Sequence, residues 1–292
     1  MIPAPFHYHA PATVAEALSL LRDHGADARL LAGGHSLLPL MKLRLAAPTH
    51  LIDLRRIPGL GEIRVGGGDV RIGAMATHWM IEASDLLRER APLLPETAGQ
   101  VGDLQVRNAG TIGGSMAHAD PAADYPAAVL ALEATLTAEG AGGRRTIPAA
   151  EFFTGLYATA LAPDEILLEV SVQNQGARSG AAYLKFPHPA SGFAVVGVAA
   201  VIQVNGRGDC ERVRVGITGV GPVPFRARAV EERVTGRAPE AEALAEAAAA
   251  AADGVEVNAD LFAPAEYRAH LARVFVRRAL AAAAERAAGG GG

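Results

Sequence analysis

Two double-glycine motifs constrain how this 292-residue chain can fold. They are Ala32-Gly33-Gly34-His35-Ser36 and Thr111-Ile112-Gly113-Gly114-Ser115, and each follows a short apolar stretch. Because glycine has no Cβ, such loops can present successive backbone N–H groups to an anion at close range. With the hydroxyls of Ser36, Thr111 and Ser115, these donors suit a pyrophosphate without any Lys or Arg. Taken alone, however, a Gly-Gly pair is more often a simple tight turn.

Other nucleotide-binding and catalytic motifs are absent from the sequence. It contains no G-x-G-x-x-G, no P-loop, no H-E-x-x-H and no G-x-S-x-G. The nine histidines are scattered, and only His35 lies inside a glycine motif, where its backbone N–H is of more interest than its ring. We therefore predict no catalytic and no metal-ligating residue in this chain.

A single cysteine, Cys210, limits the redox chemistry that the chain can carry by itself. Iron–sulfur clusters and thiolate zinc sites need about four ligands, so redox chemistry would require another cofactor. The 27 Lys and Arg against 31 Asp and Glu, with no basic run, argue against nucleic acid as a partner. No apolar stretch reaches the roughly 18 residues that span a bilayer, and no signal peptide is evident. We expect a soluble, cytoplasmic protein without a transmembrane segment.

Turn, cap and periodicity signals predict three units and a tail. The first has a helix from Thr13, a possible N-cap, to Gly25, with strands at 28–32 and 50–54. In the second, glycine turns at 66–69 and 140–145 indicate hairpins, and a strand-like piece with a glycine turn is expected at the second glycine motif. The third has strands within 181–220 and helices at 238–253 and 264–288. The expected boundaries are 1–56, 57–176 and 177–288, with a flexible tail at 289–292.

Two long segments carry a family resemblance. LLAGGHSLLPLMKLRLAAPTHLIDLRRI and RNAGTIGGSMAHADPAADYPAAVLAL, with the YLKFPHPASGFAVVGVAA segment and the AEYRAHLARVFVRRAL helix, resemble the flavin-binding subunit of the molybdenum hydroxylases, the xanthine dehydrogenase group. Within that group, the chain is most similar to the medium subunit of aerobic carbon monoxide dehydrogenase. The likeness covers nearly the whole chain, so it is far more specific than either Gly-Gly pair.

The resemblance implies an α+β fold. Two α/β subdomains would form an FAD-binding domain of the vanillyl-alcohol oxidase/para-cresol methylhydroxylase type, with FAD stretched between them. A C-terminal α+β domain would add a three-stranded antiparallel sheet and helices. By the same resemblance, the FAD pyrophosphate would lie against the two glycine motifs, at Ala32, Gly33, Gly34, His35, Ser36, Thr111, Ile112, Gly113, Gly114 and Ser115.

Four further FAD contacts are implied by the resemblance. Asp124 matches an acidic contact, although the residues alone fit a helix N-cap comparably well. Leu167 and Lys185 match an apolar and a basic contact, whereas alone they would be a core strand residue and a solvated charge. Phe193 matches an aromatic ring near the isoalloxazine, and core packing explains it equally well.

The resemblance also implies the function. The chain would take electrons from 2Fe-2S clusters on a small partner subunit, hold them on FAD and pass them to a quinone, NAD or a similar acceptor. A large partner subunit would carry the molybdopterin-type molybdenum cofactor. The three kinds of subunit would assemble as a dimer of heterotrimers that is cytoplasmic or peripheral at the inner membrane face. The alternatives are a self-contained FAD-dependent oxidase or dehydrogenase and a non-catalytic nucleotide-binding scaffold.

Overall fold

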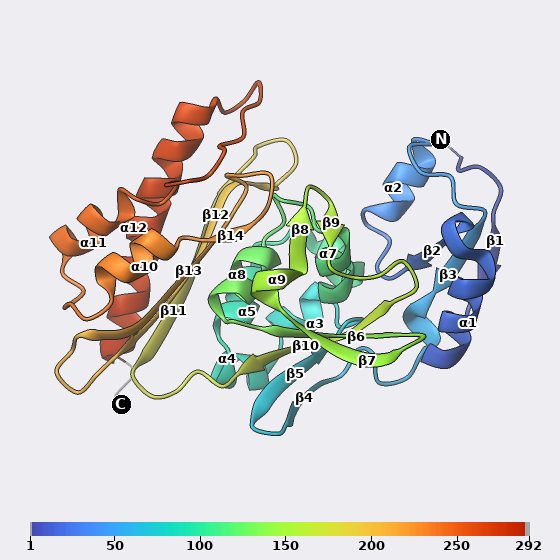
Figure 1. Ribbon diagram of the computed structural model, residues 1–292, viewed down its shortest axis with the longest axis horizontal. Helices are drawn as coiled ribbons and strands as arrows, with labels where there is room; N and C mark the ends of the chain where they lie inside the picture. The colour runs from blue at the N-terminus through green and yellow to red at the C-terminus, as the bar shows by residue number, and fades with distance from the viewer. Residues whose placement is uncertain (1, 290–292) are drawn as a thin grey trace.

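The computed structural model describes residues 2–289, and its three larger β-sheets follow one another along the long axis of the molecule (Figure 1). The N-terminal sheet lies at one end, a five-stranded middle sheet lies at the centre, and the C-terminal sheet lies at the other end with the last helices outside it. The expected α+β fold class is confirmed.

The N-terminal sheet is parallel and has the order β1-β3-β2. Its first helix follows the predicted signals: the Thr13 hydroxyl accepts from the Glu16 N–H, and the Glu16 carboxylate accepts from the Ala12 N–H. The helix ends before Gly25, which has a φ of 49°. The elements are β1 (His7–His9), α1 (Val14–His24), the 3-10 turn η1 (Gly25–Asp27), β2 (Ala28–Leu31), α2 (Leu37–Lys42), β3 (His50–Asp53) and the 3-10 turn η2 (Leu54–Arg56).

The middle sheet is antiparallel and has the order β4-β5-β10-β6-β7. The glycine run forms the predicted hairpin turn between its first two strands, with positive φ at Gly67 and Gly68. The second predicted hairpin joins β6 to β7. The strands are β4 (Ile63–Gly66), β5 (Asp69–Gly73), β6 (Thr135–Gly140), β7 (Gly143–Pro148) and β10 (Ile166–Gln173), and a small separate pair is β8 (Phe153–Gly155) and β9 (Ala158–Thr159).

Short helices surround the middle sheet, and one of them corrects a prediction. The second glycine motif is not a strand-like piece with a turn, because its glycines lie in the first turn of a helix. Thr111 caps that helix through its hydroxyl, which accepts from the Gly114 N–H at 3.0 Å. The helices are α3 (His78–Glu82), α4 (Asp85–Arg90), α5 (Leu93–Gly99), α6 (Leu104–Ala109), α7 (Ile112–His118), α8 (Tyr125–Ala131) and α9 (Ala149–Phe152).

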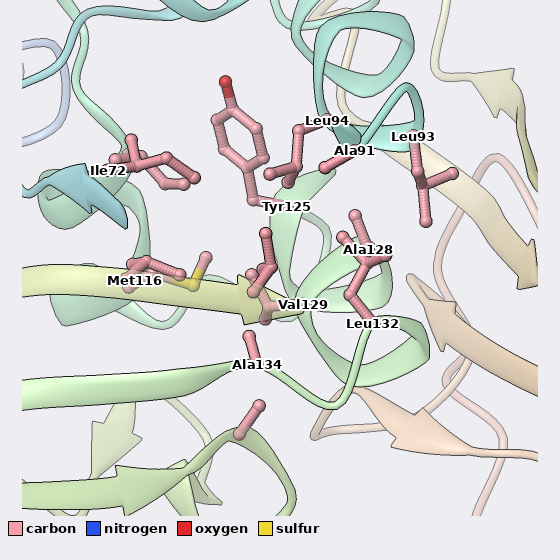
Figure 2. Packing of buried hydrophobic residues seen from close by; sticks show 14 of the residues in the cluster. Ile72, Ala91, Leu93, Leu94, Met116, Tyr125, Ala128, Val129, Leu132 and Ala134 are labelled. Atoms are coloured by element: carbon pink, nitrogen blue, oxygen red, sulfur yellow. The ribbon is translucent and has the colours of Figure 1, made fainter. Parts of the chain in front are cut away.

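The main hydrophobic core lies between the middle sheet and α8. In Figure 2, the Tyr125 and Val129 side chains of α8 lie between Leu94 of α5 and Met116 of α7, and all four are buried. Tyr183 of the next sheet belongs to the same cluster, so this core continues toward the C-terminal part. Because its neighbours are packed on both sides, α8 is held in a fixed position.

The C-terminal sheet is antiparallel and has four strands, one more than the three expected. The additional strand has two residues and pairs with Gly216 and Ile217. On one face α12 packs on β11 and β12, and on the other α8 packs on β12 and β13 (Figure 1). The elements are β11 (Ser179–Pro187), β12 (Ala194–Val204), β13 (Cys210–Thr218), β14 (Phe225–Arg226), α10 (Arg228–Val234), α11 (Ala241–Ala248) and α12 (Ala265–Gly289).

The predicted C-terminal helices differ from the structure at their ends. The helix expected at 238–253 is shorter, and residues 249–254 form turns after it. The tail expected at 289–292 is wrong at its first residue, because Gly289 ends α12; the remainder lies outside the described residues. Within residues 2–289, no helix combines the length and the hydropathy that crossing a membrane would require.

Candidate functional site

The two glycine motifs are in contact, although they are far apart in the sequence. A Cβ added to Gly33 would lie 2.2 Å from the Ala109 carbonyl oxygen and 2.6 Å from the Cα of Gly110. A Cβ added to Gly114 would lie 3.4 Å from the Cβ of Ala32. Close loop-to-loop packing therefore requires glycine at position 33.

The first loop presents backbone donors. The carbonyls of Gly34 and Ser36 accept from the N–H groups of Leu38 and Leu40. In the described part of the chain, nothing accepts a hydrogen bond from the N–H groups of Gly33, Gly34, His35 and Ser36. Gly34 has a φ of 77°, a conformation that suits glycine. Four consecutive free N–H groups next to a short helix are a donor set that suits a phosphate or another anion.

The second loop does not present its backbone donors in this way, contrary to the prediction. The N–H groups of Ile112 and Gly113 donate to the Ala76 and Ala74 carbonyls at 3.1 and 2.8 Å. Those of Gly114 and Ser115 donate to the hydroxyl and carbonyl oxygens of Thr111. Only side chains remain: the hydroxyl hydrogen of Thr111, and the half-buried Ser115 hydroxyl, which has no partner among residues 2–289.

Two buried polar groups lie beside the second loop. His78 is 4% exposed, and its backbone N–H donates to the Gly110 carbonyl. Its ring lies 5.3 Å from that of Tyr125, centroid to centroid. Within the described residues, neither the Nδ1 of His78 nor the hydroxyl of Tyr125 has a hydrogen-bond partner. The Tyr125 hydroxyl points away from the side chains labelled in Figure 2. Such groups are normally paired, so both are candidates to bind a further polar group next to the loops.

Burial determines the charge state of His78. Desolvation, reinforced by electrostatic repulsion from His35 and Arg107, lowers its pKa to about 4. The imidazole is therefore neutral at neutral pH. The buried Nδ1 of this neutral ring can donate or accept one hydrogen bond, according to the tautomer.

Asp124 and Lys185 meet in a buried polar cluster. The Asp124 carboxylate accepts from the Tyr183 hydroxyl at 2.5 Å and from Lys185 Nζ at 2.9 Å, and Lys185 also donates to the Gln100 carbonyl. Burial raises the pKa of Asp124, while Lys185 and Tyr183 act in the opposite direction. The N-cap alternative is wrong: Asp124 lies at the N-cap position of α8, but its side chain accepts no capping hydrogen bond from the helix backbone. The expectation of a solvated Lys185 from the residues alone is also wrong.

Leu167 and Phe193 have different environments. Leu167 lies on β10 and is buried in the same core cluster as Ile112 of α7. Phe193 is 44% exposed, so the core-packing alternative is wrong for this ring. The residue after it, Ala194, donates to the Ala122 carbonyl at 3.1 Å, which places Phe193 beside the segment that leads into Asp124.

Sequence reasoning missed four residues of this region: His78, Gln100, Tyr125 and Tyr183. A signal existed for Tyr183, because it precedes Lys185 by two residues on a predicted strand and so lies on the same face. His78, Gln100 and Tyr125 have no such local signal, since their partners come from other elements.

The chain matches two described protein families over most of its length. Residues 4–173 match the family described as the FAD binding domain in molybdopterin dehydrogenase, and residues 181–283 match the CO dehydrogenase flavoprotein C-terminal domain. The carbon monoxide dehydrogenase medium chain of Hydrogenophaga pseudoflava is 44% identical over 288 residues, which cover 99% of this chain and 100% of the relative. Subunit alpha of the 6-hydroxypseudooxynicotine dehydrogenase complex of Paenarthrobacter nicotinovorans is 37% identical, over 98% of this chain and 97% of the relative.

A solved structure agrees with these matches. A chain of carbon monoxide dehydrogenase from Hydrogenophaga pseudoflava, in a form that lacks the Mo-pyranopterin moiety of its cofactor, superimposes with a TM-score of 0.95. The two chains are 46% identical, and the match covers 98% of this chain and 99% of the other. The fold and the paired glycine loops define a flavoprotein subunit. The chain belongs to the FAD-binding subunits of the molybdenum hydroxylases, and its resemblance to the medium chain of carbon monoxide dehydrogenase is confirmed.

Proposed function

We propose that this chain is the FAD-binding electron-transfer subunit of a molybdenum hydroxylase complex of the carbon monoxide dehydrogenase type. Bound FAD would supply the redox chemistry, with electrons arriving from 2Fe-2S clusters of a small partner subunit and leaving to an external acceptor such as a quinone or NAD. The observation that carries the proposal is the row of four free N–H groups at 33–36, packed against the second glycine loop of a chain that matches the family along almost its whole length.

The residues of the two loops fit an FAD pyrophosphate. The N–H groups of the first loop would bind its oxygens, and the Thr111 and Ser115 hydroxyls would add donors from the second loop. No lysine is needed there, because four backbone N–H dipoles can solvate the anion. Ile112, Gly113 and Gly114 would act by shaping the second loop, because their N–H groups already donate within the protein. Ala32 would shape the first loop, where it lies beside Gly114.

The remaining site residues have supporting roles in the proposal. The ion pair of Asp124 with Lys185 would fix the start of α8 and offer its outer edge to a ribose or an amine of the cofactor. Leu167 would form apolar packing beneath α7, and the exposed ring of Phe193 would cover a face of the isoalloxazine. This assignment extends the site across the middle and C-terminal sheets. We propose corresponding domains at 1–56, 57–176 and 177–288.

The single cysteine supports the need for partner subunits. Cys210 is buried, and desolvation together with the nearby Asp209 raises the pKa of its thiol to about 11. A protonated, isolated thiol cannot hold an iron–sulfur cluster. We propose a small 2Fe-2S partner and a large molybdenum partner, assembled as a dimer of heterotrimers in the cytoplasm and able to associate with the inner membrane face.

Flavin binding tests the cofactor assignment. The full chain should purify with about one FAD, detected by visible absorbance and by release on denaturation. A Gly33→Asp variant should lose it, because the side chain would clash with Ala109 and place a negative charge at the anion site. Gly142→Asp is the matched control, since nothing lies within 4 Å of its Cβ position. Wild-type protein that folds without taking up added FAD would overturn the proposal.

Reduction of the bound flavin tests the electron-transfer role. In the purified complex with both partners, carbon monoxide should bleach the flavin absorbance, whereas the isolated chain should not respond to carbon monoxide. Bleaching of the isolated chain by a small organic substrate would favour a self-contained dehydrogenase. Flavin that stays oxidised in the complex, with carbon monoxide, a purine, an aldehyde and an N-heterocycle each supplied, would contradict both roles.

A further inference from the structure

Three histidines from three separate elements meet on the N-terminal sheet. His9 ends β1, His24 ends α1 and His50 begins β3, and all three are half-buried. One ring nitrogen from each can be chosen so that the three atoms lie within 4.8 Å of one another. This group could not be predicted from the sequence, because the three residues are widely separated and follow no metal-ligand spacing.

The rings are arranged closely. The Nε2 of His9 lies 2.9 Å from the Nδ1 of His50, and the rings of His24 and His50 stack with centroids 3.6 Å apart. His7 also stacks on His50, with the two ring centroids 5.1 Å apart. The hydrogen bond between His9 and His50 needs one neutral acceptor nitrogen, so these two rings cannot both be fully protonated while it exists.

These distances are compatible with a shared metal ion. Zinc binds imidazole nitrogens at about 2.0–2.1 Å, so two nitrogens of a tetrahedral site are about 3.3 Å apart. That spacing lies between the shortest separation here, 2.9 Å, and the outer limit of 4.8 Å. Because each nitrogen lone pair lies in the plane of its ring, binding one ion would also require the His24 ring to turn out of its stack with His50, where the ring planes are 11° apart.

The hydrogen bond between His9 and His50 places one proton between two ring nitrogens. A metal ion would replace that proton, because a nitrogen must be deprotonated to bind a metal.

We propose that His9, His24 and His50 bind a divalent transition-metal ion of the zinc class, with water completing its coordination. The ion would join β1, the end of α1 and β3, and would thereby fasten the edge strand β1 to the sheet. Because the first glycine loop leaves the opposite end of β2 from the residue that pairs with His50, the site is separate from the proposed flavin site. The proposal does not depend on flavin binding.

Metal binding by the full chain tests this site, with a preparation that has no polyhistidine tag. After removal of metals with a chelator and dialysis against zinc chloride alone, metal analysis should give one zinc per chain. The affinity should fall at least tenfold in His9→Ala and in His24→Gln. His270→Ala on α12 should retain it, because that histidine is exposed and far from the cluster in sequence and structure.

Two further readouts keep the result interpretable if a variant folds poorly. Cobalt(II) added to the wild type should give visible d–d bands that zinc displaces, and saturating zinc should raise the midpoint of thermal unfolding. Flavin content should be the same with and without the metal. Absence of stoichiometric zinc and of cobalt bands in the wild type would overturn the proposal, as would undiminished binding in folded His9→Ala and His24→Gln.

Discussion

Lys185 and Asp124 form an ion pair with their side chains only 4% and 5% exposed, and Lys185 Nζ lies 2.9 Å from Asp124 Oδ1. One partner begins α8 and the other lies on β11, so the pair links the middle part of the chain to the C-terminal sheet. Both charges have lost most of their hydration, and each depends on the other to offset that loss. A change at either residue therefore affects the packing between the two parts.

Removal of the lysine should be strongly destabilising. Lys185→Met leaves a buried carboxylate with Tyr183 as its remaining side-chain partner, and a loss of about 3–5 kcal/mol in the free energy of unfolding is expected. Urea unfolding, with and without FAD, measures it. The chain has one other lysine, Lys42, which is exposed, and Lys42→Met should change stability by no more than about 0.5 kcal/mol. Equal losses in the two variants would contradict the importance of the buried pair.

Signals that act within a few residues were predictive of the fold. Thr13 and Glu16 form reciprocal cap hydrogen bonds that depend only on neighbouring backbone, and the Gly66–Asp69 turn depends on glycine conformation. The three long strands of the C-terminal sheet likewise follow from dense β-branched segments. These elements could be identified without knowledge of the tertiary structure.

Features fixed by distant partners were not predictable in the same way. The second glycine motif was expected as a turn, but Ala74 and Ala76 accept its N–H groups and Thr111 caps a helix there. On local grounds Lys185 is expected to be a solvated charge, whereas in the structure it is paired with Asp124, which lies 61 residues away. The likeness to a known family identified both positions, while their hydrogen bonds required the structure.

A methyl group at Gly113 should disturb the second loop. The added Cβ would lie 2.4 Å from the Cβ of Ala74 and 2.6 Å from its carbonyl oxygen, so α7 would have to shift away from this residue, which follows β5. Gly113→Ala should lower the free energy of unfolding by about 1–3 kcal/mol, as overpacking typically does, and should weaken FAD binding. Gly142→Ala, in open space, is the control for thermal unfolding and flavin content. Normal values for both in Gly113→Ala would show that the loop can adjust.

His78 should make stability depend on pH in a defined window. Its pKa in the folded chain is about 4, below the ordinary 6.5, so the unfolded chain takes up the proton first as the pH falls. The contribution of His78 to the free energy of unfolding amounts to roughly 3 kcal/mol. It is complete above pH 6.5 and is lost between about pH 6.5 and 4. Across this range, the free energy of unfolding measured with urea should change less steeply with pH in His78→Phe than in the wild type or in the exposed-site control His270→Gln. Identical slopes in all three would exclude His78 as the source.

Glu133 should make the stability of the fold depend on pH in a lower pH range. Three arginines, Arg212, Arg214 and Arg226, donate to its carboxylate; partial burial alone would raise its pKa, but these hydrogen bonds hold it at about 2 against an ordinary 4.5. Because the folded-state pKa is depressed, the stabilisation is complete above pH 4.5 and declines as the pH falls toward 2.

The comparison of Glu133→Gln with the wild type isolates this contribution. The difference in unfolding free energy should be greatest near pH 6 and should shrink steadily at pH 4 and pH 3. Since the carboxylate is about one-third exposed, added salt should reduce the difference at pH 6. Glu151→Gln, at an exposed position on α9, serves as the control and should follow the wild type. A Glu133→Gln difference that is constant with pH would show that the arginines stabilise the fold by packing rather than by pairing with this carboxylate.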